Sequence, residues 1–182
     1  MPTPRASRPS SNRPAISRPW SNAPAPFASV VSTCPTATRS PKFDYKLAWF
    51  DRLNAHARDL LALEEAFTLC GDYNVIPTPD DAKDPAAWAG DALFQPESRA
   101  ALRALKFLGL SDAHDLGNEP AGTYSFWDYQ AGAWQRDHGI RIDFHLLSPQ
   151  AADRFRGIET HRAARDMDKP SDHVPVVVEL ED

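Results

Sequence analysis

Residues 67–75 read Phe-Thr-Leu-Cys-Gly-Asp-Tyr-Asn-Val, an apolar run that ends in polar residues. The run over Phe67–Cys70 predicts a short buried strand. Gly71 permits a tight exit from this strand, and the prolines that follow prevent any regular continuation. Asp72 and Asn74 stand two apart, so in extended backbone their side chains point to the same side. The stretch predicts a polar loop at a strand end that carries one carboxylate and one carboxamide.

The segments around this strand predict a mixed α/β fold. Asp44–Ala66 carries apolar residues near helical spacing behind Asp44 as a cap, which indicates a helix with one buried face. Pro96 and Gly109 mark the ends of a second helix over about Pro96–Leu108. The last strand is a nearly continuous apolar run, typical of a strand covered on both faces. Further strands are expected at Asp112–His114, Tyr124–Trp127, Ile140–Leu147, Gly157–His161 and Val174–Leu180.

Residues 1–40 differ sharply in composition from the rest of the chain. They contain five arginines among many Pro, Ser and Ala residues, and no Asp, Glu, Lys, Gly or Leu. A segment without apolar periodicity cannot offset the entropy cost of ordering, so residues 1–40 are expected to be disordered. Ordinary globular composition begins near residue 41, which divides the chain into segments 1–40 and 41–182. An organellar transit peptide is the less favoured interpretation of the first segment.

Bulk composition narrows the classes of function. A chain of 182 residues with 42% hydrophobic residues suits one domain. The net charge of −5 and the lack of a long apolar run exclude a membrane span and a globally basic nucleic-acid binder, so any DNA contact must be local. Cys34 and Cys70 lie far apart, which gives neither a CxxC metal pattern nor a disulfide framework and indicates a cytoplasmic location.

Two further clusters could carry chemistry. Arg141, Asp143 and His145 alternate with apolar residues along a strand, and Asp172 and His173 form a pair in a proline-bracketed turn. Adjacent residues of an extended chain point opposite ways, so Asp172 and His173 should serve different roles. His173 would need a carboxylate from elsewhere to fix its tautomer, and Asp143 is a candidate. Taken singly, each cluster also fits a structural turn or a solvated strand face.

Taken together, these clusters resemble one family. Their order, spacing and flanking residues are similar to those of exonuclease III and the abasic-site endonucleases of the endonuclease/exonuclease/phosphatase superfamily. The resemblance implies one half of a four-layer α/β sandwich, with a mixed sheet and flanking helices. The matching stretches are residues 42–49, 71–75, 124–129, 139–143 and 169–175.

The resemblance also implies a role for individual residues. Asp72 would handle the proton of the attacking water or of the leaving oxygen, while Asn74 and His173 would hold the scissile phosphate. Asp143 would orient His173. Asp172 would ligate the divalent ion of an in-line displacement, normally Mg²⁺, with Mn²⁺ as an alternative.

The implied partner is double-stranded DNA with abasic sites or 3′ ends, and no membrane. Intact relatives cut 5′ to abasic sites and degrade duplex DNA from the 3′ end, which makes the implied activity a DNA-repair phosphodiesterase. Phe126, Trp127 and Arg141 are expected to contact DNA, with Trp127 packed against the sugar at an abasic site. Without the resemblance, Trp127 fits a core position equally well.

The chain departs from the family in its first segment. Neither the metal-binding glutamate nor the Tyr-Leu-Pro-Asn-Gly motif of the family stands in residues 1–40. Bases that can encode residues 33–40 read Tyr-Leu-Pro-Asn-Gly-Asn-Pro-Val when the frame is shifted by one, so we hypothesise that residues 1–40 are a frameshift product. We therefore expect a truncated and inactive nuclease, with one sheet whose uncovered face favours self-association.

Two alternatives remain. One is a working phosphodiesterase of the same superfamily on a phosphoinositide or a nucleotide. The other is a non-catalytic DNA- or protein-binding module in which residues 1–40 form a basic arm that grips phosphate.

Overall fold

The computed structural model describes residues 28–31, 33–35 and 42–182. In this part of the chain, no helix is both long and apolar enough to cross a membrane. Short 3₁₀ turns lie at η1 (Pro79–Asp81), η2 (Pro85–Trp88) and η3 (Arg162–Asp166). The helices and strands are β1 (Ala28–Val31), α1 (Lys42–Leu61), β2 (Phe67–Asp72), α2 (Pro96–Lys106), β3 (Ser111–Asp112), α3 (Ala113–Leu116), β4 (Asp143–Leu147), α4 (Pro149–Ala152), β5 (Phe155–Thr160) and β6 (Val176–Leu180).

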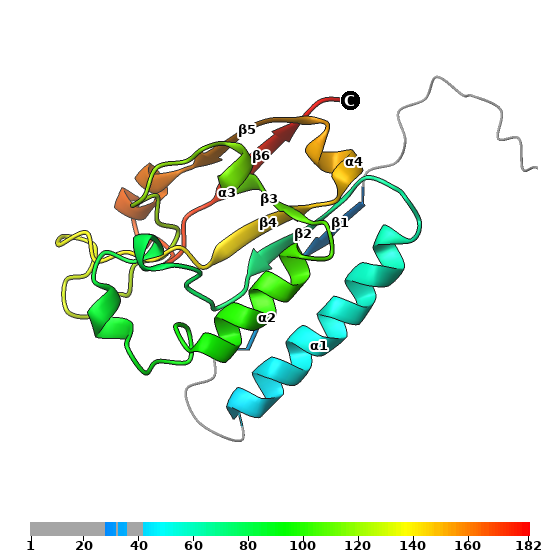
Figure 1. Cartoon of the computed structure of the whole chain (residues 1–182). Helices are drawn as coiled ribbons and strands as arrows, with labels where there is room; N and C mark the ends of the chain where they lie inside the picture. The colour runs from blue at the N-terminus through cyan, green and yellow to red at the C-terminus, as the bar shows by residue number, and fades with distance from the viewer. Residues whose placement is uncertain (1–27, 32, 36–41) are drawn as a thin grey trace, which may run out of the picture.

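A mixed four-stranded sheet forms the centre of the fold, in the order β1-β2-β4-β3 (Figure 1). β1 runs parallel to β2, whereas β4 runs antiparallel to both β2 and β3. The β2–β4 register pairs Leu69 with Leu146 and continues to Asp72 opposite Asp143. The predicted mixed α/β architecture is confirmed.

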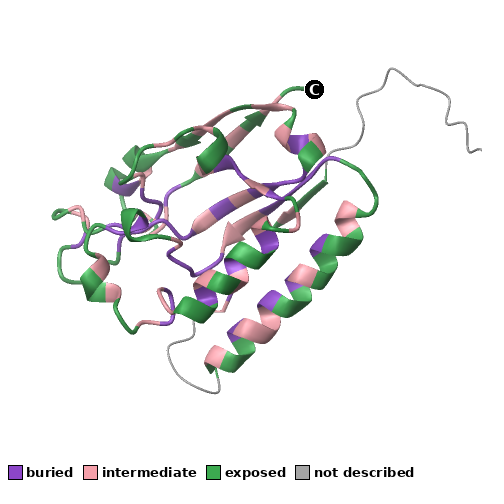
Figure 2. Cartoon of the chain, viewed as in Figure 1, coloured by how far each residue is buried: buried purple, intermediate pink, exposed green. Residues whose placement is uncertain are grey.

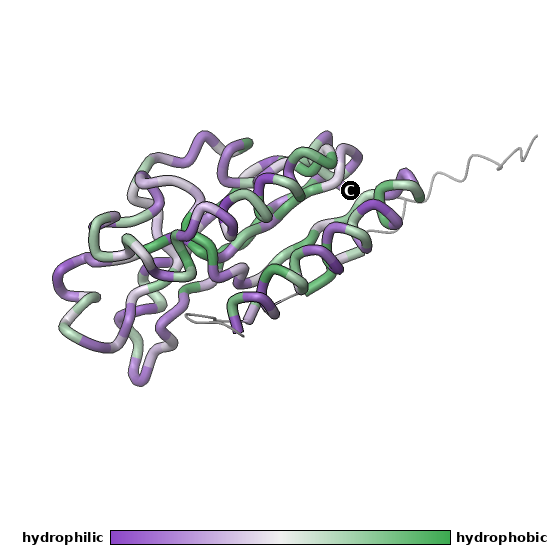
Figure 3. The backbone as a smooth tube through the Cα atoms, turned by 60° about the horizontal axis from the view of Figure 1, so that its bottom comes forward, coloured by the Kyte–Doolittle hydropathy of each residue, from purple (hydrophilic) through white to green (hydrophobic). Residues whose placement is uncertain are grey.

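Helices α1 and α2 lie side by side on one face of this sheet (Figure 1). The buried positions of α1 are Lys46, Phe50, Leu53 and Ala57, a stripe at helical spacing. Polar and apolar residues alternate along both helices, and β2 and β4 beneath them are buried or half-buried, whereas the edge strand β1 is largely exposed (Figures 2 and 3). The main core lies between the helices and the sheet, and its members include Phe50, Leu69, Tyr73, Leu105 and Phe144.

A second sheet corrects the expectation that the chain keeps only one. β5 and β6 pair antiparallel on the side of the first sheet that faces away from α1 and α2 (Figure 1). Ile158 and Val178 pack against a small core around Leu147. The expectation that the last strand is covered on both faces is wrong: its residues alternate between half-buried and exposed, and Val177 is 48% exposed. The reason is that β6 presents one face to the core and the other to solvent.

Several predicted boundaries shift. The first helix begins at Lys42 and ends at Leu61, so Asp44 lies in its first turn instead of capping it. The strand expected over Asp112–His114 ends at Asp112, because the Asp112 carboxylate accepts a hydrogen bond from the His114 amide and starts α3. Tyr124–Trp127 forms no strand, and only Phe126 pairs, through single bridges to Ile140 and His173.

Part of the first segment forms a strand, whereas its composition predicts disorder for all of residues 1–40. Ala28–Val31 form β1, because a short apolar run can complete its hydrogen bonds along the edge of β2. The Cys34 amide then donates to the Asp72 carbonyl at 2.7 Å, and Cys34 is fully buried. Residues 1–27, 32 and 36–40 of this segment lie outside the described residues.

Packing of α1 against the sheet predicts a large difference between two phenylalanines. Phe50 is 2% exposed and Phe107 is 85% exposed. Phe50→Ala should lower the free energy of unfolding by about 3–5 kcal/mol, because it leaves a cavity in the main core. Phe107→Ala should change it by less than about 0.5 kcal/mol. Urea denaturation measures both, and equal losses would contradict the core assignment.

Candidate active site

The β2–β4 register brings two carboxylates to the same edge of the sheet. Asp72 ends β2 and Asp143 begins β4, and the two residues are direct partners. His173 reaches this edge from the turn before β6, and its Nδ1 lies 2.9 Å from Asp143 Oδ2. Among the described residues, no partner contacts the other ring nitrogen, Nε2, which leaves it available to a substrate. The structure thus brings Asp72, Asp143 and His173 together from three separate segments.

Asn74 is bound tightly to Asp72. Its backbone amide donates to Asp72 Oδ1 and its Nδ2 donates to Asp72 Oδ2, each at 2.8 Å. Nδ2 also donates to the Cys34 carbonyl at 2.9 Å. A carboxamide nitrogen has only two hydrogens, so Asn74 can donate to a phosphate oxygen only after it releases one of these acceptors.

The ionisable groups of the site have shifted pKa values. Burial raises the pKa of Asp72 from 3.8 to about 6; the amide hydrogen bond from Asn74 opposes this shift and the charge of Asp143 adds to it. Burial by itself would lower the pKa of His173, but the hydrogen bond and charge of Asp143 raise it above 6.5, with smaller contributions from Asp72 and Asp172. Asp72 can therefore exchange a proton near neutral pH, and His173 holds its proton more readily than a free imidazole.

Asp172 is the expected metal ligand and lies half-buried in the turn next to His173. Its Oδ1 accepts a hydrogen bond from the Ser171 hydroxyl at 3.4 Å. Across residues 28–31, 33–35 and 42–182, no three His, Cys, Asp or Glu side chains are grouped so that they could hold a metal ion. Mg²⁺ needs one or two carboxylates together with waters and substrate oxygens. The described residues supply one candidate ligand and do not form a complete metal site.

The two aromatic residues expected at the DNA surface differ in exposure. Phe126 is half-buried and its ring lies edge-on to His173, with the ring centroids 4.9 Å apart. Trp127 is fully buried: its Nε1 donates to Asp137 Oδ1 at 3.2 Å and its ring packs against Trp134. Neighbouring residues of an extended segment face opposite ways, so only one of the two can face the site. Trp127 thus takes the core position that the sequence also allowed, and its expected contact with DNA stays a prediction.

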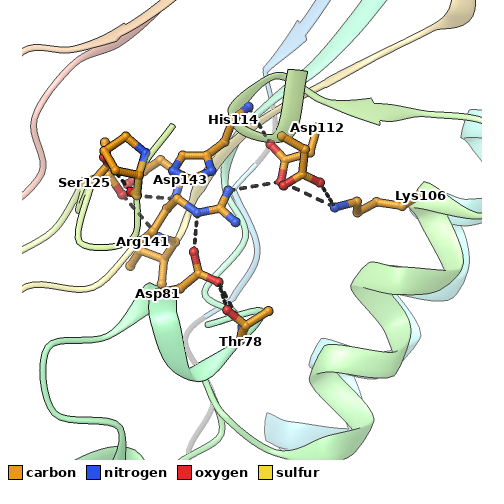
Figure 4. Close-up of polar contacts among 12 residues, drawn as sticks. Thr78, Asp81, Lys106, Asp112, His114, Ser125, Arg141 and Asp143 are labelled. Carbon is orange, nitrogen blue, oxygen red and sulfur yellow. Dashed lines mark hydrogen bonds and ion pairs between the residues drawn. The ribbon is translucent and has the colours of Figure 1, made fainter. Parts of the chain in front are cut away.

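Arg141 is also a core residue, and its expected contact with DNA stays a prediction. It is 6% exposed, and its guanidinium bonds Asp81 Oδ1 at 2.6 Å and Asp112 Oδ2 at 3.0 Å (Figure 4). Lys106 lies 3.7 Å from the same Asp112 oxygen. Two carboxylates from separate segments therefore bind the guanidinium, which ties η1 and the end of β3 to the segment that leads into β4.

Ser125 supports the site and was not singled out from the sequence. Its hydroxyl accepts hydrogen bonds from the backbone amides of Ile142 and Asp143, both at 3.2 Å (Figure 4). Ser125 is 1% exposed, so these bonds satisfy two donors away from water. Sequence pattern alone gives no signal for such a contact, because it joins positions far apart in the chain.

A family match agrees with this fold and site. The model described as the endonuclease/exonuclease/phosphatase family matches residues 4–173, and the chain belongs to this family. The matched range begins within the first segment, whereas the stretches that carry the resemblance begin at residue 42.

Named relatives are DNA nucleases. The exodeoxyribonuclease of Bacillus subtilis is 30% identical over 151 residues, which cover 82% of this chain and 58% of that protein. The DNA repair nuclease APEX1 of Danio rerio is 30% identical, with 85% of this chain and 49% of that protein covered. This chain therefore spans about half the length of these curated relatives.

Solved structures give the same fold. A 3′–5′ exonuclease from Neisseria meningitidis superposes with a TM-score of 0.79 at 32% identity, covering 84% of this chain and 60% of that chain. An AP endonuclease from Archaeoglobus fulgidus gives a TM-score of 0.78 at 29% identity, covering 84% of this chain and 61% of that chain.

Burial of the Arg141 ion pairs predicts a strong effect on stability. Arg141→Met leaves two buried carboxylates short of their cation and should lower the free energy of unfolding by about 3–5 kcal/mol. Arg156 pairs with Glu181 at the surface, where both side chains are at least 50% exposed. Arg156→Met should cost less than about 1 kcal/mol. Urea denaturation of both variants checks this, and a small loss for Arg141→Met would rule out a structural role.

The raised pKa of Asp72 predicts a pH dependence. Between pH 3.8 and about 6 the folded protein retains a proton that the unfolded chain has released. The free energy of unfolding should therefore fall as pH rises through this window, and Asp72→Asn should remove that part of the fall. The raised pKa of His173 changes the free energy of unfolding only above pH 6.5, which lies outside this window. Unfolding curves at pH 4, 5 and 6 test this; a constant difference between the two proteins would contradict it.

Proposed function

We propose that this chain carries the acid–base and phosphate-binding part of a DNA phosphodiesterase site of the exonuclease III and AP endonuclease type. The observation that carries the proposal is the meeting of Asp72 with the Asp143–His173 pair at one edge of the sheet. The names of the relatives, which are exodeoxyribonucleases and AP endonucleases, support DNA as the substrate.

Each residue has a chemical task in this proposal. Asp72, whose pKa is about 6, takes a proton from the attacking water or returns one to the leaving oxygen. Asp143 holds Nδ1 of His173, so that Nε2 donates to a phosphoryl oxygen. Asn74 becomes a second donor to the phosphate once the Cys34 carbonyl is displaced. Phe126 packs beside the imidazole and limits the directions in which His173 can turn.

The proposed activity of the free chain depends on whether it has the metal-binding residues of the family. We infer that it is a truncated nuclease with little or no activity alone, because neither the metal-binding glutamate nor the Tyr-Leu-Pro-Asn-Gly motif of the family stands in residues 1–40. The proposed partners are duplex DNA with abasic sites or 3′ ends, Mg²⁺ or Mn²⁺, and a second copy of the chain through its incompletely covered sheet. Two free cysteines favour the cytoplasm.

The free chain is tested with duplex oligonucleotides that contain an abasic-site analogue, in MgCl₂ and in MnCl₂. We expect binding by fluorescence anisotropy and slow or absent cleavage. Salt-dependent binding that does not distinguish abasic from intact duplex, and that is lost when residues 1–27 are deleted, would favour the binding module with a basic arm. Cleavage of a phosphoinositide or nucleotide instead of DNA would favour the other phosphodiesterase.

A chimaera tests the catalytic roles separately. Residues 42–182 replace the matching C-terminal part of the Bacillus subtilis exodeoxyribonuclease, which supplies its own N-terminal part. The chimaera should cut DNA, and Asp72→Asn or His173→Gln should lower its rate by at least about 100-fold. Arg103→Gln, on the exposed face of α2, is the control and should leave the rate unchanged. Full activity of the Asp72→Asn chimaera would refute the role of Asp72.

A further inference from the structure

Lys46 is a buried cation that the proposed reaction does not use. It occupies a core position in the apolar stripe of α1, four residues before Phe50, and it is 0% exposed. Burying an ammonium group is costly unless hydrogen bonds or an opposite charge compensate. In the described part of the chain, no carboxylate forms an ion pair with its Nζ. A buried lysine without an ion pair is not expected to stabilise the fold by itself, so its role lies in the other contacts of its ammonium group.

The Lys46 ammonium binds two backbone carbonyls. Nζ donates to the Asn74 carbonyl at 2.5 Å and to the Ala92 carbonyl at 3.2 Å. The Ala92 carbonyl also accepts from the Ser98 hydroxyl at 2.7 Å, so it remains satisfied without Lys46. In the described residues, Lys46 is the one donor to the Asn74 carbonyl. The contact that depends on Lys46 is therefore the contact to the candidate active-site loop.

Asn74 needs such a contact because its backbone is unusual. Its φ is +50°, in the left-handed region that residues with a side chain adopt rarely. In this conformation the amide of Asn74 points at Asp72 Oδ1 while the carboxamide points at Asp72 Oδ2 and the Cys34 carbonyl. Rotation of the peptide that follows Asn74 would break the bond to Lys46. The ammonium thus opposes relaxation of the loop to an ordinary conformation.

We propose that Lys46 is a positioning residue that holds the Asn74 backbone in its left-handed conformation through the Asn74 carbonyl, and so sets the direction of the Asn74 carboxamide and of the Asp72 carboxylate. Lys46 itself touches neither substrate nor metal. The functional value of this positioning rests on the proposed phosphodiesterase site, but the contact itself can be tested without DNA.

The wild-type protein provides the first test. Nuclear magnetic resonance with ¹⁵N and ¹³C labels should detect a scalar coupling across the hydrogen bond from Lys46 Nζ to the Asn74 carbonyl carbon. The ammonium hydrogens should exchange slowly with water because Lys46 is buried. Lys42, an exposed lysine on the same helix, should show neither signal. A Lys46 ammonium that exchanges as fast as that of Lys42 would overturn the proposal.

Lys46→Met separates positioning from general stability. Met fills a similar volume, and removing the cost of burying the ammonium offsets the loss of the donor to the Asn74 carbonyl, so the urea midpoint should stay close to that of the wild type. Hydrogen exchange of the Asn74 amide should become at least about tenfold faster, while that of Leu69 in β2 stays unchanged. Lys46→Arg, which keeps a donor to the carbonyl, should restore slow exchange. Lys42→Met is the matched control and should change nothing.

The hydrogen-exchange result at Asn74 tests the positioning role independently of the DNA assays. Faster exchange at Asn74 with an unchanged urea midpoint supports the positioning role even if the chimaera proves inactive. Exchange that rises equally at Asn74 and Leu69 shows a purely structural lysine and overturns the proposal. If Asn74 is loosened and the Lys46→Met chimaera still cuts DNA at the full rate, positioning stands and the role of Asn74 in the proposed function fails.

Discussion

The register between β2 and β4 is the constraint on which the candidate site depends. It sets Asp72 directly opposite Asp143, and it directs the odd-numbered residues of β2, such as Leu69, toward α1 and α2. A shift of one residue would turn Leu69 away from the core and would carry Asp72 to the wrong face. Packing of the core therefore fixes the positions of Asp72 and Asp143, and the same apolar residues that stabilise the fold also align the candidate site.

Local pattern was sufficient to predict the elements that build this register. The apolar run over Phe67–Cys70, the alternation before His145 and the two helices were recognised because each is decided by its own residues. The pairing of Asp143 with His173 also followed from the sequence, since a histidine in a turn needs a carboxylate to fix its ring. What the sequence could not give was the exact end of each element, which depends on contacts such as that of Asp112 with His114.

Residues whose burial could not be predicted from the sequence share one feature: their burial is decided by partners far away in the chain. Arg141 was expected at a DNA surface because nothing near it in sequence shows that Asp81 and Asp112 converge on its guanidinium. For Trp127 both a DNA contact and a core position stayed open, because no local pattern tells which of two adjacent aromatic residues turns inward. Lys46 left a signal that could have been used, since a lysine four residues before Phe50 interrupts the apolar stripe of α1.

Lys46 and Arg141 suggest how irregular backbone is held around the site. Strands β2 and β4 are fixed by their ladder of hydrogen bonds, whereas the loop at Asn74 and the turn at Asp81 have no ladder. A buried cation that bonds such a loop forms hydrogen bonds strengthened by its charge, and breaking them would leave that charge without compensation. These hydrogen bonds offset part of the cost of burying the two charges, and they hold each loop in one conformation. The proposed phosphodiesterase site, in which a carboxylate and a carboxamide act on one phosphate, requires such rigidity.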